Sequence, residues 1–205
     1  MSLSRTQGVV IREVSTGEAD KIVTILTRKH GKIKAAARGA KKPSSKLMSC
    51  TQLFSYCDFM LFKGRDLYRI SSCELIEPFY NLRSDMVILT HAAHVIDLIN
   101  TVTQENQPSF RILQLLLNTL GMLSEGRKKP ELLTRIFEMR LISIIGYRPH
   151  IDNCIICGGN VENSAGFSFG HCGIVCGKCY GNDLTAKPIR QGTLKALRYI
   201  ILTEP

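Results

Sequence analysis

Long apolar stretches are absent from this 205-residue sequence. No run of eighteen apolar residues occurs, so we expect no membrane span. The first five residues, MSLSR, lack the apolar segment of a signal peptide, and we therefore expect a cytoplasmic protein. Thiols stay reduced in that compartment, so Cys50, Cys57 and Cys73 are expected to be small core residues rather than disulfide partners.

The signatures of several enzyme classes are also missing. The sequence contains no GxxxxGK[ST] phosphate-binding loop, no HExxH metalloprotease motif and no GxSxG nucleophile elbow. No acid and base pair stands out either. These absences favour a binding protein over an enzyme.

Acidic residues are missing between Asp20 and Asp58. The same stretch holds nine basic residues, namely Lys21, Arg28, Lys29, Lys32, Lys34, Arg38, Lys41, Lys42 and Lys46. A face that serves only solubility normally mixes both signs, whereas a field of one sign attracts a polyanion. The pattern therefore favours nucleic acid as the partner. A merely solvated basic face and an acidic protein partner are the two alternatives.

Two CxxC pairs are the most specific motif in the chain. Eighteen residues separate the pairs, which consist of Cys154, Cys157, Cys176 and Cys179. This spacing is typical of a closed four-cysteine site, in which each tight turn aims two thiolates at one zinc ion, or at iron in its place. A closed site stabilises structure, so we predict structural Zn²⁺. Another register, with His171 or Cys172 replacing a ligand, remains open.

Residues 1–80 have the pattern of a small β-barrel. Short β-branched, aromatic or alternating runs occur at 9–11, 21–27, 32–38, 53–62 and 67–76, with turns between them. Five short strands with regularly spaced turns suit a small closed barrel.

The hydrophobic period changes to that of helices after residue 80. The spacing predicts helices that begin near Ser84, Ser109 and Pro130, with the third ended by Gly146. Their short connections predict a helical bundle over residues 81–150. The four-cysteine module follows over residues 151–182. A last amphipathic helix, with Thr193 as its N-cap, lies in residues 190–205 and is expected to pack on the bundle.

These parts, in this order, resemble the bacterial recombination-mediator family RecO. The resemblance rests on Gly17-Glu18-Ala19-Asp20 with the strand after it, on Ala37-Arg38-Gly39-Ala40-Lys41-Lys42 with Ser45, on Phe137-Glu138-x-Arg140-Leu141 with Gly146-Tyr147-x-Pro149, and on the CxxC pairs with Phe167-Ser168 and Gly173. Family members usually carry two glycines before the third cysteine, and Cys172 stands at the first of these positions. They also usually run some tens of residues further, which leaves open whether this chain is truncated at Pro205.

The resemblance implies an α+β multidomain protein with an N-terminal OB-fold barrel over residues 1–80, a helical bundle and a zinc-finger module. It implies a role in DNA repair and homologous recombination, through the RecF pathway, in a cytoplasmic and nucleoid-associated protein. Such proteins bind single- and double-stranded DNA, anneal complementary strands and act with RecR to load RecA on DNA coated with single-strand-binding protein (SSB). A zinc-containing nucleic-acid-binding regulator or ribosome-associated protein is the alternative.

The expected DNA-binding residues lie in the basic stretch. They are Arg28, Lys29, Lys32, Lys34, Arg38, Lys41, Lys42 and Lys46, with Tyr56, Phe59 or Tyr68 as candidate stacking aromatics. The resemblance also implies a site for the acidic C-terminal tail of SSB, for which Arg135 and Arg140 are candidates. The alternative is that both arginines are ordinary helix-surface charges, with Arg135 paired to Glu131.

Overall fold

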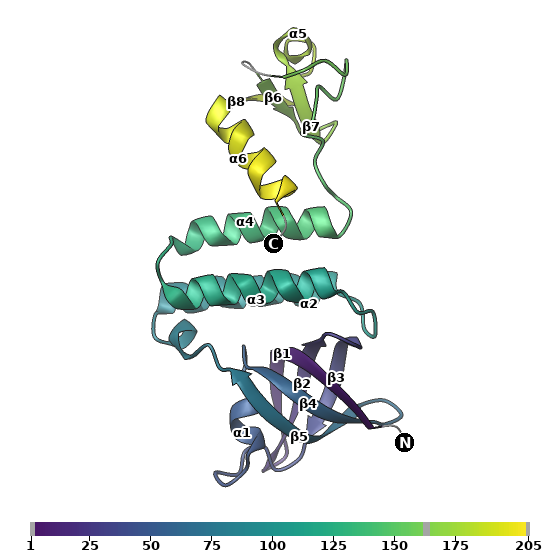
Figure 1. The fold of residues 1–205 in the computed structure, drawn as a ribbon, viewed down its shortest axis with the longest axis vertical. Coiled ribbons are helices and arrows are strands. Elements are labelled where there is room, and N and C mark those ends of the chain that lie inside the picture. Colours follow the sequence, from purple (N-terminus) through teal and green to yellow (C-terminus); the bar gives the residue numbers. More distant parts are fainter. Residues whose placement is uncertain (1–2, 162–164, 204–205) are drawn as a thin grey trace. The chain divides into compact units, whose positions relative to one another are not determined.

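The structure is a computed structural model that describes residues 3–161 and 165–203. The chain divides into two compact units, the first ending at Phe137 and the second beginning at Glu138. Figure 1 labels their helices and strands. No helix in the described ranges is long and apolar enough to cross a membrane.

The first unit begins with a closed five-stranded barrel in the order β1-β2-β3-β5-β4. Its strands are β1 (Leu3–Thr16), β2 (Asp20–Thr27), β3 (Gly31–Ala37), β4 (Tyr56–Lys63) and β5 (Tyr68–Glu77). All pairings are antiparallel except β3 with β5, where Ala35 lies opposite Tyr68 in parallel register. The predicted OB-like barrel is therefore confirmed.

β1 closes the barrel because it bends. Its register against β2 shifts between Val10 and Arg12, as at a β-bulge, which sharpens the local bend. The part before the bend, from Leu3 to Val9, pairs with β4, and Gly8 to Thr16 pairs with β2. The prediction of a short strand at residues 9–11 was too narrow, because the polar residues before it still pair through their backbone.

The barrel interior is filled by alternate residues of the strands, together with Ala40 and Cys50 from the segment between β3 and β4. Buried members of this core are Val10, Val23, Ile25, Ile33, Ala35, Ala37, Ala40, Cys50, Cys57, Phe59, Leu61 and Ile70. Cys50 lies on the short helix α1 (Leu47–Cys50), and Cys73 packs partly against the same core. The predicted role of these cysteines as core residues is confirmed for Cys50 and Cys57.

The strand expected at residues 53–62 begins only at Tyr56. Phe54 is buried with φ at +71°, a left-handed conformation that cannot continue a β-strand. The guanidinium of Arg83 lies 5.6 Å from the centre of the Phe54 ring, which holds this turn against the residues after β5.

Helices follow the barrel, as predicted. They are the 3₁₀ helix η1 (Tyr80–Arg83), α2 (Met86–Val102), α3 (Phe110–Glu125) and α4 (Pro130–Ile144). The N-cap of α2 is Asp85 rather than the expected Ser84, because its carboxylate accepts from the backbone N–H groups of Val87 and Ile88. Ser109 caps α3 as predicted. In the first unit, His91 Nδ1 on α2 lies 2.8 Å from Thr134 Oγ1 on α4.

The second unit contains a three-stranded antiparallel sheet in the order β7-β6-β8, with two further helices. Its elements are β6 (Ala165–Ser168), β7 (Gly173–Cys176), α5 (Gly177–Tyr180), β8 (Ala186–Ile189) and α6 (Gln191–Leu202). α6 starts at Gln191, two residues before the predicted cap Thr193, so that prediction was wrong. Leu194 of α6 is buried in one core with Ile151, Cys154, Val161, Ile174, Val175 and Ala186.

Candidate metal centre and nucleic-acid interface

The two CxxC pairs meet at one point of the second unit. The sulfur atoms of Cys154, Cys157, Cys176 and Cys179 all lie within 4.8 Å of one another. The Sγ atoms of Cys157 and Cys176 are 3.7 Å apart. A tetrahedral zinc with Zn–S bonds of about 2.3 Å needs sulfur atoms about 3.8 Å apart, so the four thiols fit such an ion.

The first pair is shaped by a turn that requires glycine. Gly158 has φ at +72°, and its N–H donates to the Cys154 carbonyl at 2.8 Å. The Cys154 N–H in turn donates to the Gly159 carbonyl at 2.9 Å. In the second pair, Cys176 precedes the first residue of α5 and Cys179 lies within that helix. Both thiols of each pair thus point to the same side of a tight turn.

The pKa values of these thiols are set by backbone N–H groups and by one another, with no positive charge among the causes. Burial raises the pKa of Cys154. Hydrogen bonds from the backbone N–H groups of Cys157, Cys176 and Ile156 outweigh this effect and lower the pKa to about 6. The neighbouring sulfurs of Cys157 and Cys176 keep the proton on Cys179 and raise its pKa to about 12. Four thiolates so close together repel one another, and a bound dication would remove that repulsion.

Neither Cys172 nor His171 belongs to the group of four candidate metal ligands. Cys172 Sγ lies 3.6 Å from the carbonyl oxygen of Phe169, and the Cys172 backbone is left-handed with φ at +52°. This is the position at which the resemblance expects glycine, the residue that tolerates such a φ without steric cost. The backbone at Cys172 therefore has a conformation that suits glycine, although the residue here is a cysteine.

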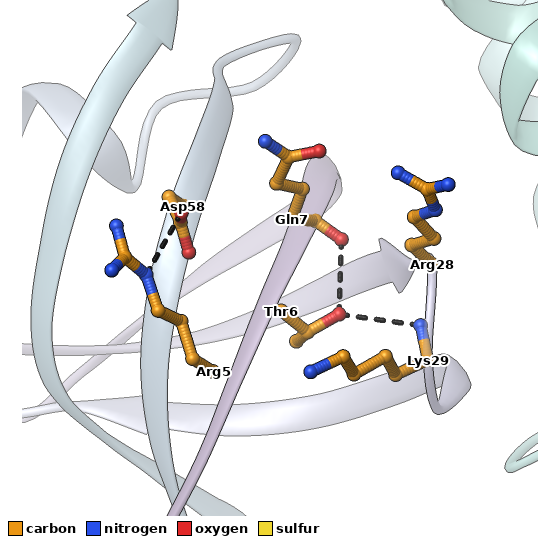
Figure 2. Close-up of a pocket in the computed structure, with 6 residues that line it drawn as sticks. All are labelled: Arg5, Thr6, Gln7, Arg28, Lys29 and Asp58. Atoms are coloured by element: carbon orange, nitrogen blue, oxygen red, sulfur yellow. Dashed lines mark hydrogen bonds and ion pairs between the residues drawn. The ribbon is translucent and has the colours of Figure 1, made fainter.

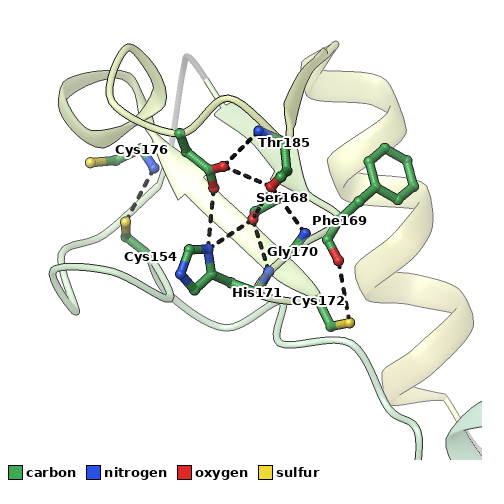
Figure 3. A network of polar contacts seen from close by, with 9 residues as sticks. Cys154, Ser168, Phe169, Gly170, His171, Cys172, Cys176 and Thr185 are labelled. Atoms are coloured by element: carbon green, nitrogen blue, oxygen red, sulfur yellow. Dashed lines mark hydrogen bonds and ion pairs between the residues drawn. The ribbon is translucent and has the colours of Figure 1, made fainter.

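His171 takes part in a separate polar network with Ser168, Asp183 and Thr185 (Figure 3). His171 Nδ1 lies 3.1 Å from Ser168 Oγ and 3.3 Å from Asp183 Oδ2. Bonds from the side chains of Ser168 and Thr185 hold the pKa of Asp183 well below its usual range. Because one ring nitrogen faces both the serine and the aspartate, the histidine cannot relay a proton between them as a catalytic base does. The network instead ties the end of β6 to the segment before β8.

The basic stretch of the first unit divides into two clusters at opposite ends of β3. We name Arg28, Lys29 and the neighbouring Arg5 the turn cluster, and Arg38, Lys41, Lys42 and Lys46 the loop cluster. All seven residues are exposed. β3 has seven residues, so the clusters are separated by roughly 20 Å of strand.

The turn cluster borders a cavity of about 320 Å³, lined by Arg5, Thr6, Gln7, Arg28, Lys29 and Asp58 (Figure 2). The β2–β3 turn is pinned to β1, since Arg28 N–H donates to the Gln7 carbonyl and Lys29 N–H donates to Thr6 Oγ1. On the other side, Arg5 Nε donates to Asp58 Oδ2 at 3.0 Å. The sequence offered no signal for Arg5, which lies outside the acid-free stretch.

The loop cluster is held by the aspartate of the Gly17-Glu18-Ala19-Asp20 motif. Asp20 Oδ1 accepts from the Gly39 N–H at 2.7 Å, and the Lys41 N–H donates to the Ala19 carbonyl at 2.9 Å. Two segments that share the family resemblance are therefore neighbours in space. The motif orders the backbone that presents Arg38, Lys41 and Lys42.

Lys32 and Lys34, between the two clusters, contact the end of α2 and the loop that follows it. Lys32 Nζ donates to the Asn100 carbonyl at 2.6 Å. Lys34 Nζ lies 2.6 Å from Glu105 Oε1, and hydrogen bonding with Lys34 lowers the pKa of Glu105. Asn106 N–H also donates to the Lys32 carbonyl. Of the eight predicted DNA-binding residues, these two thus already have partners within the protein.

The three candidate stacking aromatics differ in accessibility. Phe59 is fully buried in the barrel core and cannot meet a base. Tyr56 is half-buried, and its hydroxyl donates to Gln7 Oε1. The Tyr68 ring is half-buried and lies 5.6 Å from that of His30. Sequence reasoning missed Phe110, which is half-exposed and lies under the Arg28 guanidinium.

The two candidate SSB-tail residues also differ. Arg135 is exposed on α4. Arg140 is half-buried and donates to the Ile200 carbonyl and to Thr203 Oγ1, near the end of α6. Its guanidinium therefore caps a helix of the second unit.

Comparison with known proteins adds a direct identification. The family model "Recombination protein O N terminal" matches residues 1–79, and "Recombination protein O C terminal" matches residues 83–204. The chain belongs to the RecO family. It is 50% identical to the DNA repair protein RecO of Acetivibrio thermocellus over 98% of this chain and 80% of that protein. Identity to the DNA repair protein RecO of Alkaliphilus metalliredigens is 39%, over 97% of this chain and 81% of the relative.

RecO membership confirms the resemblance that the sequence motifs carried. The first RecO model ends two residues after β5, and therefore covers the barrel with both basic clusters. The second covers the helices and the four cysteines. The N-terminal and the C-terminal model of the family thus both match this chain.

Proposed function

We propose that this chain is a DNA repair and recombination mediator that works by binding rather than by catalysis. In this proposal it binds single- and double-stranded DNA, anneals complementary strands and, with RecR, promotes RecA loading on DNA coated with SSB. The observation that carries the proposal is the presence of two exposed basic clusters on one OB-like barrel. Membership in a family of DNA repair proteins supports the same function.

The barrel supplies the chemistry that sequence-tolerant DNA binding requires. Exposed lysines and arginines neutralise phosphates and release counterions, and this needs no base contacts. Annealing requires that the repulsion between two strands be screened, which the same cations achieve. A protein with these properties would not depend on a catalytic constellation.

The four-cysteine group is proposed to hold one structural Zn²⁺. Its role would be to stabilise a small module whose sheet has only four-residue strands. Such a module buries little apolar surface, so metal binding would supply much of its folding free energy.

A salt titration with matched variants tests the DNA-binding proposal. The slope of log affinity against log salt on single strands is about −0.7 for each phosphate contact. Arg38→Ala/Lys41→Ala/Lys42→Ala should weaken binding to all sequences alike, flatten this slope and slow annealing. Arg127→Ala/Lys128→Ala/Lys129→Ala removes the same charge from an exposed segment outside the barrel and serves as the control.

The outcome also separates the alternatives. A nucleic-acid-binding regulator or ribosome-associated protein would prefer one sequence or RNA fold. A structural adaptor for an acidic protein would bind DNA only weakly. If the loop-cluster variant and the control variant bind and anneal alike, the proposed DNA site is wrong.

For the SSB tail, the proposal keeps Arg135 as the candidate contact and gives Arg140 a mainly structural role. Titration of a tail peptide against Arg135→Ala should show weaker binding. Arg140→Ala should instead lower the stability of the second unit, because the carbonyl of Ile200 loses its donor. Equal peptide affinity of the wild type and Arg135→Ala would remove Arg135 from the site.

A further inference from the structure

An aromatic ring lies beside the turn cluster. The Arg28 guanidinium carbon lies 4.9 Å from the centre of the Phe110 ring, a cation–π distance. Phe110 is the first residue of α3, and 52% of its surface remains exposed. The guanidinium contacts the ring without covering it, so the ring can still receive another flat group.

Arg28, which contacts this ring, also lines a cavity that offers groups for both parts of a nucleotide. The exposed cations of Arg28 and Lys29 suit phosphates. Gln7 lines the same cavity, and because its side-chain carbonyl accepts from Tyr56, the group it offers to the edge of a base is the amide N–H₂. A cavity of about 320 Å³ is in the size range of small-ligand pockets.

Arg5 has a different task from the other two cations. Asp58 Oδ2 accepts from Arg5 Nε, whereas the buried Oδ1 atom of Asp58 has no hydrogen-bond partner among the described residues. Drawing Arg5 away to a phosphate would leave a carboxylate that is 16% exposed without its counter-charge. Arg5 therefore stays on Asp58, and Arg28 and Lys29 are the phosphate-contacting members of the cluster.

The site is already shaped for a ligand. The backbone hydrogen bonds from Arg28 and Lys29 to β1 hold the turn, and Ser109 Oγ caps the helix that presents Phe110. Little ordering is then required when a ligand binds, which favours affinity.

We infer that Phe110 and the turn cluster form a stacking site for one unpaired nucleobase, with Arg28 and Lys29 on the adjacent phosphates. This inference rests on the proposed function and adds to it a reason why single strands would be distinguished from duplexes. In a duplex the bases are stacked on one another and cannot reach the ring. The loop cluster, which has only charge to offer, would bind both forms.

The chain contains no tryptophan, which gives the site a direct optical test. Phe110→Trp introduces a single fluorophore at the proposed stacking position. Oligothymidylate should quench its emission, and an oligonucleotide of equal length made of abasic nucleotides should not. Tyr80→Trp, at another exposed aromatic position of the first unit, is the control and should respond to neither.

Affinity provides the second readout. Phe110→Ala should weaken binding of oligothymidylate about tenfold, the usual effect of losing one base–aromatic stack, and leave duplex and abasic binding unchanged. The inference is overturned if Phe110→Ala lowers all three affinities equally, or if the wild type does not prefer thymidylate to abasic DNA. If the wild type binds no DNA, the proposed function fails as well. If only the loop-cluster variant loses binding, the fluorescence of Phe110→Trp still decides the stacking site. Quenching by oligothymidylate supports the site, and the absence of quenching overturns it.

Discussion

Lys34 Nζ and Glu105 Oε1 lie 2.6 Å apart, joining β3 to the loop between α2 and α3. Both side chains are about half-exposed, so the pair contributes little to stability. Its consequence is electrostatic, because Glu105 neutralises a cation in the middle of the basic stretch. The loop thereby separates the two clusters that the sequence presents as one continuous run.

Replacing Glu105 should expose that cation. Glu105→Gln should strengthen single-strand binding about two- to fivefold at low salt and steepen the salt slope by roughly 0.7, because Lys34 becomes free to meet a phosphate. Fluorescence anisotropy with labelled oligonucleotides measures both quantities. Glu125→Gln, an exposed carboxylate of α3, is the control. The gain should vanish in Lys34→Ala/Glu105→Gln, and its persistence there would show that Lys34 is not responsible.

Metal content should depend on the paired cysteines alone. Cys157→Ser should lower the zinc content of purified, reduced protein and destabilise the second unit, because a hydroxyl replaces a thiolate ligand. Cys172→Ser should retain one ion per chain, since Cys172 lies outside the sulfur group. Elemental analysis gives the stoichiometry. A value near zero in the wild type, or a loss caused by Cys172→Ser, would contradict the assignment.

Gly31 should be among the least replaceable residues of the barrel. Its φ is +66°, and a Cβ there would lie 2.2 Å from the Gln107 carbonyl oxygen, which is backbone and cannot rotate away. Gly31→Ala should therefore cost about 3 kcal/mol or more. Gly17→Ala is the matched control, because Gly17 has φ at +60° with open space around it, and should cost about 1 kcal/mol. Equal unfolding midpoints in urea would refute the close approach.

Cys172 should accept glycine more readily than valine. A left-handed φ of +52° strains any side chain, and a β-branched one most of all. Cys172→Gly should match or exceed the wild type in stability, and Cys172→Val should be about 1–2 kcal/mol less stable than Cys172→Gly. Thermal unfolding of the metal-bound chain checks the order. Indistinguishable glycine and valine variants would mean that the backbone is not held in this conformation.

His30 should make folding stability depend on pH. Burial, and then the charges of Lys29 and Lys63, lower the pKa of His30 below its usual 6.5. The unfolded chain therefore binds this proton at a higher pH than the folded chain does. Stability should rise with pH between the lowered pKa and about 6.5, and this component should be missing in His30→Gln. An NMR titration that places His30 above 6.5 would contradict the sign.

Features that depend on residues close together in the chain could be predicted from the amino-acid order. Short β-branched, aromatic or alternating runs with regular turns predicted five strands, and apolar spacing predicted helices that begin near Ser109 and Pro130. The CxxC pairs predicted which thiols meet, because a two-residue gap brings both sulfurs of a pair to one side of a turn. The family motifs, including Asp20 and the segment around Gly39, could also be recognised in the sequence, because each consists of residues close together in the chain.

Long-range packing, in contrast, determines which charges and rings share a surface. Arg28 and Phe110, or Lys34 and Glu105, lie on elements far apart in sequence, and no local pattern records that they touch. Phe59 and Tyr68 look alike as strand aromatics, yet barrel closure buries Phe59 and leaves Tyr68 half-exposed. Closure sets which face of each strand turns inward, and the packing of the α2–α3 loop sets which cations stay available. Both follow from long-range contacts, whose free energy comes from burying surface that the linear sequence does not display.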